Sequence, residues 1–526
     1  MMNEKEASNR LRRRLLWWRI PTLTLLLIAA GYLYISKHDH LLHTLQVSKD
    51  PVALQGSFKL KHVYRHGLGD FDRYHQRLDV TPEFVSEAGE YYQQHISVAS
   101  DEEELWTTNE KYRTQNPFDF IFNLKSQAIG MTRMLHRHPD FVESYLDFAR
   151  DSPHLASKVN LEWIDDAVLA PNISDKDTVV NLALMSSNAY VRMPHTGDWR
   201  NITNPWNHTT SSGHGWDGDG VRGHVFVKDD EDVVVIAVKG TSAQGLAGSG
   251  DDETTVNDKI NDNLLFSCCC ARISYLWTTV CDCYVKSYTC DETCLEKELR
   301  RKDRYYSAVL DVYRDVLEQY PNAAIWITGH SLGGAMASLV GRTYGLPAVA
   351  FEAPGELLAS RRLHLPMPPG LPLYMEGVWH FGHTADPIFM GTCNGASSSC
   401  SIGGYAMETS CHSGKVCVYD VVSDKGWHVN MLNHRIHTVI DGVLNGYENV
   451  AKCGAPEPCH DCYNWNFIKG REIVTTRPGK PSTTKSKTTI STATTPAGTI
   501  TVVPTQPATS SSCVGRNWLG FCTKYD

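Results

Sequence analysis

The sequence predicts an α/β fold with a mainly parallel central sheet. Two observations predict it: short apolar runs alternate with amphipathic runs between residues 232 and 388, and a serine flanked by glycines stands where one apolar run meets a helical one. Within the apolar runs, polar residues do not alternate with apolar ones. Each strand is therefore expected to be buried on both faces, as in parallel sheets covered by helices. The order of strands and helices favours repeated β-α-β units.

The expected elements follow in order along the chain. Residues 177–192 have the apolar spacing of a helix with an aspartate near its start, whereas residues 40–230 otherwise show no clear pattern. Residues 232–241, DVVVIAVKGT, are a β-branched run that predicts a buried strand. The elements expected after it are a helix at 305–321, a strand at 323–328, a helix at 332–345, and strands within 347–355 and 377–388.

Composition and charge restrict the class of protein. The chain has 526 residues, of which 42% are hydrophobic, enough for one large core or two medium ones. Its net charge of −9 favours no nucleic acid as a partner, and its 23 histidines contain no HExxH metal spacing. Sixteen cysteines, an even number, indicate an oxidising compartment. Three glycosylation acceptors, at Asn172, Asn201 and Asn207, predict a glycoprotein in a secretory lumen.

The N-terminus predicts a membrane anchor. Residues 1–19 carry five arginines and form an expected cytosolic basic tail, and residues 20–36 carry no charge. A short apolar span with arginines on one side is typical of a transmembrane signal-anchor whose basic end stays in the cytosol. Residues 37–470 would then form the lumenal domain of a single-pass type II membrane protein. The alternative is a cleaved signal peptide, although the sequence offers only a poor small-residue cleavage site.

Residues 471–526 differ in composition from the body of the chain. They are rich in Ser, Thr and Pro and have little to bury, which predicts a disordered, O-glycosylated tail. The tail ends with Cys513 and Cys522, which could form a small loop or link back to the body.

A cysteine-rich insertion occupies residues 242–300. Seven cysteines lie between Cys268 and Cys294, so if all of them pair, at least one bridge leaves the cluster. Further on, Cys459 and Cys462 have the spacing of half a metal site. No second CxxC at zinc-finger spacing accompanies them, and disulfides are favoured in a lumen.

A serine between glycines is the first sign of chemistry. The sequence reads Gly329-His330-Ser331-Leu332-Gly333, a GxSxG pattern with an apolar run before it and a small-residue helix after it. In that context the serine occupies a strained strand-to-helix turn, and the next amide can donate to an oxyanion. Ser331 is therefore the predicted nucleophile, and the Leu332 amide is one predicted oxyanion donor. The alternative is a structural glycine turn.

A serine nucleophile needs a base, and the base needs an acid that orients it. In α/β-hydrolases the three follow in the chain order Ser, Asp, His. Asp386 follows the last predicted strand, where this fold places its acid, and Asp420 and Asp424 are weaker rivals. Spacing leaves the choice of base open among three histidines that follow Asp386: His434, His437 and His428.

Two further positions bear on the site. Thr241 ends the β-branched strand, and its amide, with its hydroxyl as an extra donor, is the expected second oxyanion contribution. The alternative there is a hairpin turn at Lys239 and Gly240. His330 is adjacent to Ser331, is expected to point away from it, and is discounted as the base.

These motifs resemble those of the class three, or fungal-type, lipases. The shared features are KGT at a strand end, TGHSLGG at the elbow, and DPI some fifty residues later. The Arg-rich anchor, the CCC insertion, NHRIHTVI and the Ser/Thr-rich tail narrow the resemblance to the fungal autophagic-body (vacuolar) lipases of that family. The resemblance implies an α/β-hydrolase of the fungal-lipase type. By position it implies Ser331 as nucleophile, Asp386 as orienting acid and Thr241 as oxyanion residue, and it favours His434 over His437 as base.

The resemblance also implies an activity and a place. The activity would be that of a carboxylic ester hydrolase, a triacylglycerol lipase or phospholipase, acting on membrane phospholipids and phosphoinositides without a metal or cofactor. The role would be the disintegration of autophagic bodies and multivesicular-body vesicles. The protein would pass through the ER and Golgi to multivesicular-body and prevacuolar or endosomal membranes, and then reach the vacuole lumen.

In fungal lipases a lid follows the oxyanion strand, and residues 242–300 occupy that place. The apolar stretch 263–280 is therefore expected to be exposed and to gate the site or touch a bilayer. The alternative is a disulfide-stapled structural excursion. Two rival functions stay open: a serine peptidase or acyltransferase on the same fold, and a non-catalytic membrane glycoprotein.

Overall fold

The computed structural model describes residues 54–67, 75–96, 106–191, 193–194, 199–202, 220–241, 253–272, 279–395, 397–470, 513–516 and 522–525. Among these residues, no helix is both long and apolar enough to cross a membrane. The predicted anchor at 20–36, the acceptor Asn207 and the apolar residues 273–278 lie outside the described ranges.

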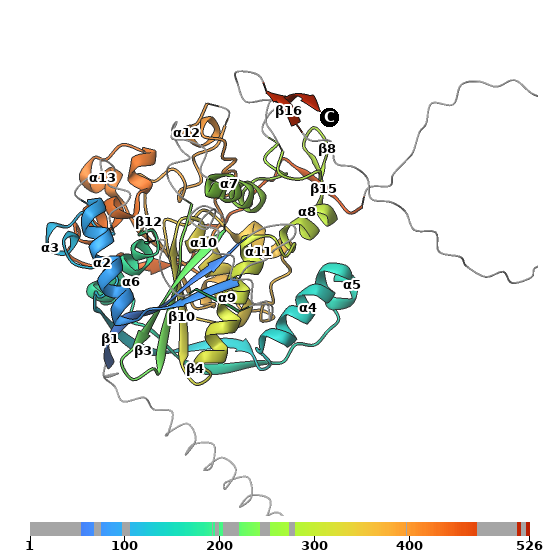
Figure 1. Ribbon diagram of the computed structural model, residues 1–526. Coiled ribbons are helices and arrows are strands. Elements are labelled where there is room, and N and C mark those ends of the chain that lie inside the picture. Colours follow the sequence, from blue (N-terminus) through green and yellow to red (C-terminus); the bar gives the residue numbers. More distant parts are fainter. Residues whose placement is uncertain are drawn as a thin grey trace, which may run out of the picture. The chain divides into compact units, whose positions relative to one another are not determined.

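The chain divides into two units, Met1–Arg471 and Glu472–Asp526. In the second unit, β16 (Cys513–Arg516) and β17 (Cys522–Tyr525) form an antiparallel hairpin. The first unit contains all the other helices and strands that the structure describes (Figure 1).

The first unit is organised around one twelve-stranded sheet. Its strands are β1 (Leu54–His66), β2 (His75–Asp79), β3 (Phe122–Met134), β4 (Trp163–Pro171), β5 (Trp199–Asn201), β6 (Val221–Lys228), β7 (Val233–Val238), β10 (Ala324–His330), β11 (Ala348–Phe351), β12 (Val378–His383), β13 (Lys415–Tyr419) and β14 (Cys453–Gly454). Their order is β14-β13-β12-β11-β10-β7-β6-β1-β2-β5, with β3 paired to β1 and β4 to β3. A smaller sheet joins β15 (Asn466–Ile468), β9 (Thr289–Asp291) and β8 (Tyr284–Lys286).

The half of the sheet that leads to Ser331 is parallel. Strands β7, β10, β11, β12 and β13 all run in one direction, with Ile327 of β10 opposite Ile236 of β7 and Ala348 of β11. The other half, from β6 through β1 to β4, is antiparallel. The prediction of a mainly parallel sheet is therefore wrong, because the sheet is mixed.

The antiparallel half has local causes. Only residues 229–232, all acidic, separate β6 from β7, a connection that suits a hairpin but is far too short for a parallel crossover. In β1 the register with β6 shifts between Leu60 and His62. Such a bulge breaks the period of two by which a strand is recognised in a sequence, so β1 was not predicted.

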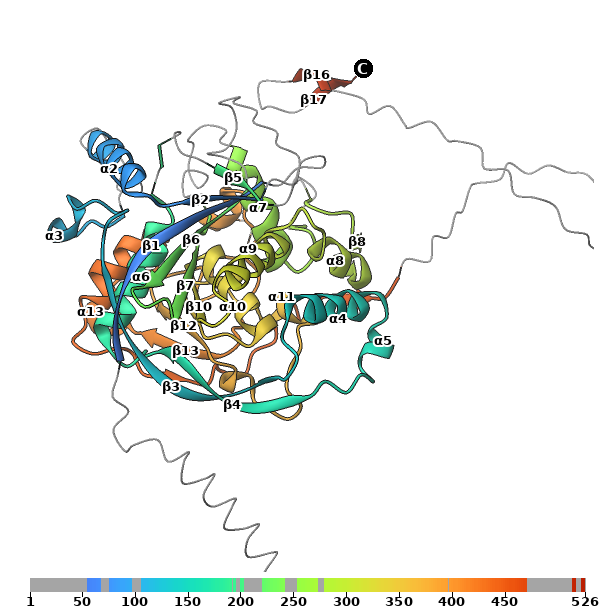
Figure 2. The ribbon, with the colours of Figure 1, turned by 60° about the horizontal axis from the view of Figure 1, so that its bottom comes forward.

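Helices cover both faces of the sheet. They are α2 (Pro82–Ile96), α3 (Glu110–Arg113), α4 (Pro139–Asp151), α5 (Pro153–Ala156), α6 (Lys176–Asn188), α7 (Glu253–Phe266), α8 (Glu292–Leu299), α9 (Tyr305–Gln319), α10 (Leu332–Tyr344), α11 (Leu357–Arg362), α12 (Ser399–Ile402) and α13 (Val421–Lys425), with short turns of other helix types at η3 (Leu373–Met375), η4 (Met431–His434) and η5 (Thr438–Leu444). Figure 2 shows α6 on one side of β6, β7 and β10, and α9 and α10 on the other. Accordingly, Ile236 of β7 packs in the core with α9 and α10, whereas its neighbour Val235 packs with α6.

The three predicted helices are confirmed, and their ends have clear causes. Helix α6 begins after Asp175, whose carboxylate accepts from the Thr178 amide. Helix α9 ends two residues before Pro321. Helix α10 ends at Gly345, which has φ 66°, the left-handed conformation that glycine adopts at helix ends.

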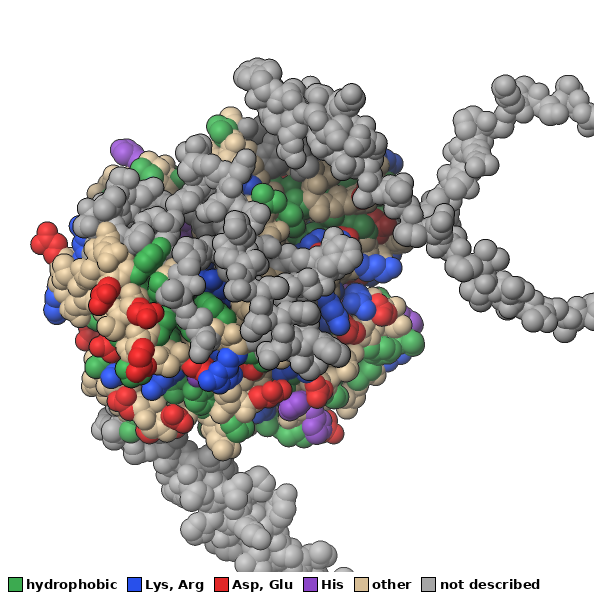
Figure 3. All heavy atoms as spheres, viewed as in Figure 1, with side chains coloured by type: hydrophobic (Ala, Val, Ile, Leu, Met, Phe, Trp, Pro, Cys, Tyr) green, Lys and Arg blue, Asp and Glu red, His purple; other side chains and the backbone are tan. Residues whose placement is uncertain are grey.

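Charged side chains of both signs are intermixed on the face drawn in Figure 3. Neither sign forms an extended patch among the described residues of this face.

One disulfide holds the cysteine-rich insertion to the body, and three more close loops within the insertion. The seven bonds among the described residues are Cys268–Cys462, Cys269–Cys290, Cys270–Cys281, Cys283–Cys294, Cys393–Cys400, Cys411–Cys459 and Cys417–Cys453. The prediction that one bridge leaves the cluster is confirmed by the bond from Cys268 to Cys462. The preference for disulfides over a metal half-site at Cys459 and Cys462 is also confirmed.

The apolar start of the insertion is buried. Leu264, Leu265 and Phe266, at the end of α7, are at most 2% exposed and belong to the core that also contains α9 and α10. The expectation that the stretch 263–280 exposes its apolar side chains is therefore wrong for these three residues. The cause is tertiary, because the helix docks its apolar end on the body, and the next residues are bonded there through Cys268.

The Cys268–Cys462 bond should contribute more stability than a short-range bond. It closes a loop of 194 residues, against 7 residues for Cys393–Cys400. Loop-closure entropy assigns up to about 5 kcal/mol to the longer loop and about 2.5 kcal/mol to the shorter. We expect the double variant Cys268→Ala/Cys462→Ala to lose more unfolding free energy in urea than Cys393→Ala/Cys400→Ala. Equal losses would contradict an entropic origin.

Candidate active site

Ser331 stands at a sharp turn between β10 and α10. Its backbone has φ 57° and ψ −128°, a conformation that residues other than glycine rarely adopt. The neighbouring strand fixes this turn, because the Ser331 amide donates to the Phe351 carbonyl of β11 at 2.9 Å. Backbone strain of this kind persists only where the surrounding structure holds it, and it concentrates at functional sites.

The two glycines of the GxSxG pattern are required by close backbone contacts. A Cβ on Gly329 would lie 2.4 Å from the Gly333 carbonyl carbon, and a Cβ on Gly333 would lie 2.1 Å from the Val238 carbonyl oxygen. Both distances are far below any van der Waals contact. The start of α10 is therefore pressed against the end of β7, and this approach presents Ser331 next to the Gly240–Thr241 segment.

Three side chains from distant segments form a hydrogen-bonded chain. The Ser331 hydroxyl Oγ lies 2.8 Å from His434 Nε2, and His434 Nδ1 lies 2.6 Å from Asp386 Oδ2. Ser331 begins α10, Asp386 follows β12, and His434 ends η4. A carboxylate accepts only, so Nδ1 carries the imidazole proton and Nε2 is free to accept from the serine.

Asp386 is a buried carboxylate with strong partners. It is 0% exposed, and its Oδ1 accepts from the Ile388 amide at 2.8 Å. Burial by itself raises the pKa of Asp386, but the charge and hydrogen bond of His434, with other donors, outweigh burial and hold that pKa at about 2. The acid is therefore ionised at any pH above about 2.

The rival residues lie elsewhere. Asp420 caps α13 by accepting from the Ser423 amide, and Asp424 accepts from the Tyr447 hydroxyl. His428 is exposed. His437 lies just before η5, and it is the ring of His434 that meets both Ser331 and Asp386.

The side chain of His330 has a structural role that the sequence did not reveal. Its Nε2 donates to the His434 carbonyl at 2.8 Å, and its Nδ1 lies 2.9 Å from the Tyr190 hydroxyl. Burial lowers the pKa of His330 to about 3, so the ring stays neutral. As expected, His330 makes no bond to Ser331, but it holds the backbone of the residue that does.

The oxyanion side of the site is built from β7 and α10. Leu332 is the first residue of α10, where amides have no partner within the helix and can face an anion. A Cβ on Gly240 would lie 3.2 Å from Ser331 Cβ, which brings the Gly240–Thr241 segment beside the serine. The hairpin alternative at Lys239 is excluded, because β7 is already paired with β6 and with β10.

The Thr241 hydroxyl does not have the role of extra oxyanion donor that the sequence predicts, because it is bonded elsewhere. It donates to Asp262 Oδ2 of α7 at 2.7 Å. Asp262 is buried, and burial, together with the nearby Asp258, raises its pKa to about 8 despite this hydrogen bond. The bond therefore ties the end of β7 to α7, and the Thr241 amide is what the segment can offer to an oxyanion. An aspartate within α7 gave no sequence signal of this contact.

Three groups of side chains within the described residues have the spacing of metal ligands. Two of them consist mainly of cysteines that are already in disulfides. The third is the buried trio Glu356, His380 and His412. This trio contacts the segment that follows the acid Asp386, because His412 Nε2 donates to the Phe389 carbonyl at 3.1 Å.

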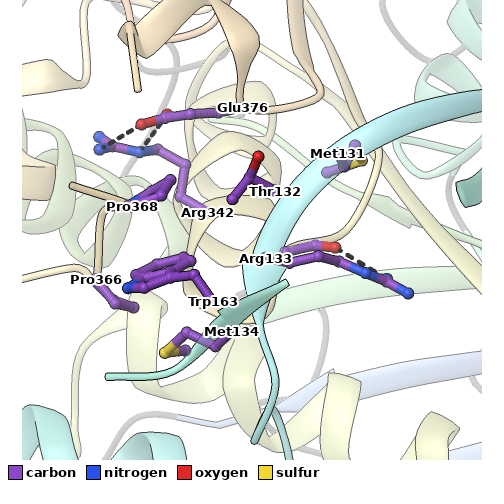
Figure 4. A pocket seen from close by; sticks show the side chains of 10 residues that line it. Met131, Thr132, Arg133, Met134, Trp163, Arg342, Pro366, Pro368 and Glu376 are labelled. Atoms are coloured by element: carbon purple, nitrogen blue, oxygen red, sulfur yellow. Dashed lines mark hydrogen bonds and ion pairs between the residues drawn. The ribbon is translucent and has the colours of Figure 1, made fainter. Parts of the chain in front are cut away.

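A small pocket is lined by residues of β3, β4 and the end of α10 (Figure 4). Its wall contains the ion pair of Arg342 and Glu376, with Nε and Oε2 at 2.8 Å. Arg342 comes eleven residues after Ser331 along α10, a distance of about 16 Å. The cavity of about 20 Å³ accommodates no more than a single water molecule, so it is no substrate site.

The parallel strands with helices on both faces, the elbow serine and the later acid and histidine define an α/β-hydrolase. A family model described as Lipase (class 3) matches residues 253–344. The "Putative lipase ATG15" of Saccharomyces cerevisiae strain YJM789 is 60% identical over 536 residues, covering 100% of both chains. That of Kluyveromyces lactis is 63% identical over 479 residues, covering 89% of this chain and 88% of its own. The chain belongs to the class 3 lipase family, with these yeast proteins as relatives.

The family membership supports a lipase, and therefore an ester hydrolase. Among solved structures, the Lip2 lipase from Yarrowia lipolytica is 17% identical, over 38% of this chain and 61% of that chain, with a TM-score of 0.20. At this TM-score the likeness supports no conclusion about the chain.

The contact between Gly333 and β7 should be sensitive to one methyl group. We expect Gly333→Ala to force the start of α10 away from Val238 and to destabilise the fold by about 1–3 kcal/mol. Hydrolysis of a short soluble ester should fall with it. The control is Gly130→Ala, whose added Cβ meets nothing within 4 Å. Urea unfolding and ester kinetics of both variants measure the effect, and two indistinguishable variants would contradict the steric argument.

Proposed function

We propose that the protein is a serine lipase that hydrolyses acyl esters of membrane lipids, with Ser331 as nucleophile, His434 as base and Asp386 as the orienting acid. The observation that carries this proposal is the hydrogen-bonded chain from Ser331 Oγ through His434 to Asp386. A serine hydroxyl becomes nucleophilic when a neutral imidazole accepts its proton, and the imidazole needs a carboxylate to hold its tautomer.

The reaction follows from this arrangement. His434 Nε2 takes the hydroxyl proton while Ser331 Oγ attacks the acyl carbonyl, and the amides of Leu332 and Thr241 stabilise the oxyanion. The same imidazole gives its proton to the leaving alcohol, and an acyl-serine remains. Water, deprotonated by His434, then attacks the acyl-serine and releases the fatty acid.

The substrate proposed is a membrane phospholipid, with phosphoinositides included as substrate or binding surface. Support comes from apolar side chains beside the catalytic segments: Val429 and Leu432 precede His434 and are 57% and 55% exposed, and Met390 follows Asp386 and is 39% exposed. Apolar side chains exposed next to an active site are suited to a lipid surface. Under this proposal these residues, rather than the buried start of the insertion, touch the bilayer.

The setting proposed is the vacuole lumen, where the enzyme disintegrates autophagic bodies and multivesicular-body vesicles. It would travel through the ER and Golgi as a type II membrane glycoprotein and enter by multivesicular-body and prevacuolar or endosomal membranes. The name ATG15 of the relatives, the disulfides and the three acceptor asparagines support this route.

The catalytic assignment predicts a sharp contrast between two neighbouring histidines. We expect Ser331→Ala and His434→Ala to lower ester hydrolysis by roughly 10⁴-fold or more, because each removes a member of the catalytic unit. His437→Ala, which leaves the hydrogen-bonded chain intact, should keep activity within about tenfold. Rates on a soluble ester and labelling by a fluorophosphonate measure both effects.

Controls for this experiment separate the rival functions. Peptide substrates and an alternative acyl acceptor run beside the ester distinguish a peptidase or an acyltransferase. Wild-type protein that neither labels nor hydrolyses any ester would refute the catalytic proposal and favour a non-catalytic glycoprotein. Loss of activity in His437→Ala but not in His434→Ala would refute the choice of base.

The apolar rim predicts a defect confined to membranes. Burial of a leucine side chain is worth about 1.5–3 kcal/mol, so Leu432→Asp should lower activity on phospholipid vesicles by roughly 10-fold or more and leave a soluble ester unaffected. The matched control is Leu155→Asp in α5, where the leucine is similarly exposed at 53%. An equal vesicle defect in both variants would argue against contact through this rim.

A further inference from the structure

A second carboxyl group lies next to the catalytic acid. Glu352 is the first residue after β11, the strand beside that of the nucleophile, and it is 0% exposed. Its backbone has φ 46°, a left-handed conformation that is uncommon for glutamate. The amide of Glu352 donates to the Phe381 carbonyl of β12 at 2.8 Å, which fixes the side chain at the edge where Asp386 lies.

Glu352 has no cation as partner among the described residues. The nearest basic group is His383, whose Nε2 lies 3.6 Å from Glu352 Oε1. That Nε2 donates to the Asn433 carbonyl at 3.0 Å, and His383 Nδ1 accepts from the Ala385 amide at 3.2 Å. A ring that donates at one nitrogen and accepts at the other is neutral. The closest amide, that of His383, is 3.4 Å from Glu352 Oε2, a long hydrogen bond.

Glu352 Oε1 is buried and has no hydrogen-bond partner among the groups described so far, and the remaining neighbour that interacts with the Glu352 carboxyl group is Asp386. Two carboxyl groups can share a hydrogen bond only if one of them keeps a proton. Asp386 is the ionised member, because its oxygens already accept from His434 Nδ1 and from the Ile388 amide. The proton therefore belongs to Glu352, and the Glu352 hydroxyl is the donor.

We propose that Glu352 is a positioning residue that, as a neutral carboxylic acid, donates a hydrogen bond to Asp386 and holds the acid turned toward His434. This inference rests on the proposed function for its kinetic consequence, but the protonation of Glu352 does not depend on catalysis. Together Glu352 and Asp386 then carry one negative charge, which balances the single positive charge that His434 gains when it takes the serine proton.

The arrangement sets a direction for the pH dependence. The titratable groups around Glu352 are Asp386, His383, and, beyond Asp386, His434 and His330. Burial and the charge of Asp386 raise the pKa of Glu352 well above its usual value. The folded protein thus keeps this proton while the unfolded chain loses it near the ordinary glutamate value. As pH rises between those two values, the contribution of Glu352 to stability falls. Above the raised pKa, two carboxylates would repel each other in the site.

The experiment compares full-length wild-type protein with Glu352→Gln and Glu352→Ala. The glutamine variant keeps an N–H donor and cannot ionise, whereas the alanine variant has no donor. We expect Glu352→Gln to keep kcat within about threefold of wild type and to stay active at an alkaline pH where the wild type declines. Glu352→Ala should lose roughly 10–100-fold in kcat with little change in KM, the scale of a misplaced catalytic group.

A spectroscopic measurement tests the proton directly. The infrared difference spectrum of wild type minus Glu352→Gln at neutral pH should contain the carbonyl stretch of a buried protonated carboxyl. The difference removes the contribution of Asp262, which both proteins share. Absence of this band would overturn the proposal, and so would an alanine variant with the kcat and alkaline profile of the wild type. A wild type that shows the band but hydrolyses no ester would refute the proposed function and leave the protonation of Glu352 standing.

Discussion

The structure depends on the close approach of backbones around Ser331. The first turn of α10 lies against the carbonyl end of β7, and Gly329, two residues before the serine, lies against the same turn, so that neither Gly329 nor Gly333 has room for a Cβ. The Ser331 amide is bonded to β11 at the same point. These contacts force the left-handed conformation of the serine. The contact between the first turn of α10 and the end of β7, called the crossing below, is the point around which the catalytic segments are arranged. The strain is retained because four parallel strand pairings hold the surrounding segments in place.

Around this crossing the site contains one buried charge and several buried neutral groups. Asp386 is ionised, whereas His330 and His383 each donate at one nitrogen and accept at the other, and are neutral. A buried charge is tolerated where its hydrogen bonds are complete. The histidines also position backbone, since His330 and His383 donate to the carbonyls of His434 and Asn433. The segment that carries the base is thus held by two rings from the strands beneath it.

One disulfide and several buried hydrogen bonds attach the insertion to this frame. The Thr241 hydroxyl donates a hydrogen bond to the carboxyl group of Asp262 in α7, so the segment that carries the oxyanion amide contacts the insertion. The Cys268–Cys462 bond then joins the end of that helix to residues near the end of the first unit. The described part of the insertion is buried at its start and is held by disulfides. The apolar surface next to the catalytic histidine comes instead from the segment around Leu432.

The sequence by itself determined the local features: the elbow, the strands β7, β10, β11 and β12, the helices α6, α9 and α10, and the candidates Asp386 and His434. Each is recognisable because glycine spacing, apolar period and chain order are properties of neighbouring residues. The antiparallel half of the sheet was not predicted from the sequence, because a bulge in β1 breaks the period of two and the acidic turn after β6 was not recognised as a hairpin. Only the tertiary structure decided between His434 and His437, assigned the Thr241 hydroxyl to Asp262, buried Phe266, and brought Glu352 to Asp386. These outcomes depend on contacts between residues tens to hundreds of positions apart, and no local pattern encodes which of two nearby side chains completes a hydrogen bond across such a distance.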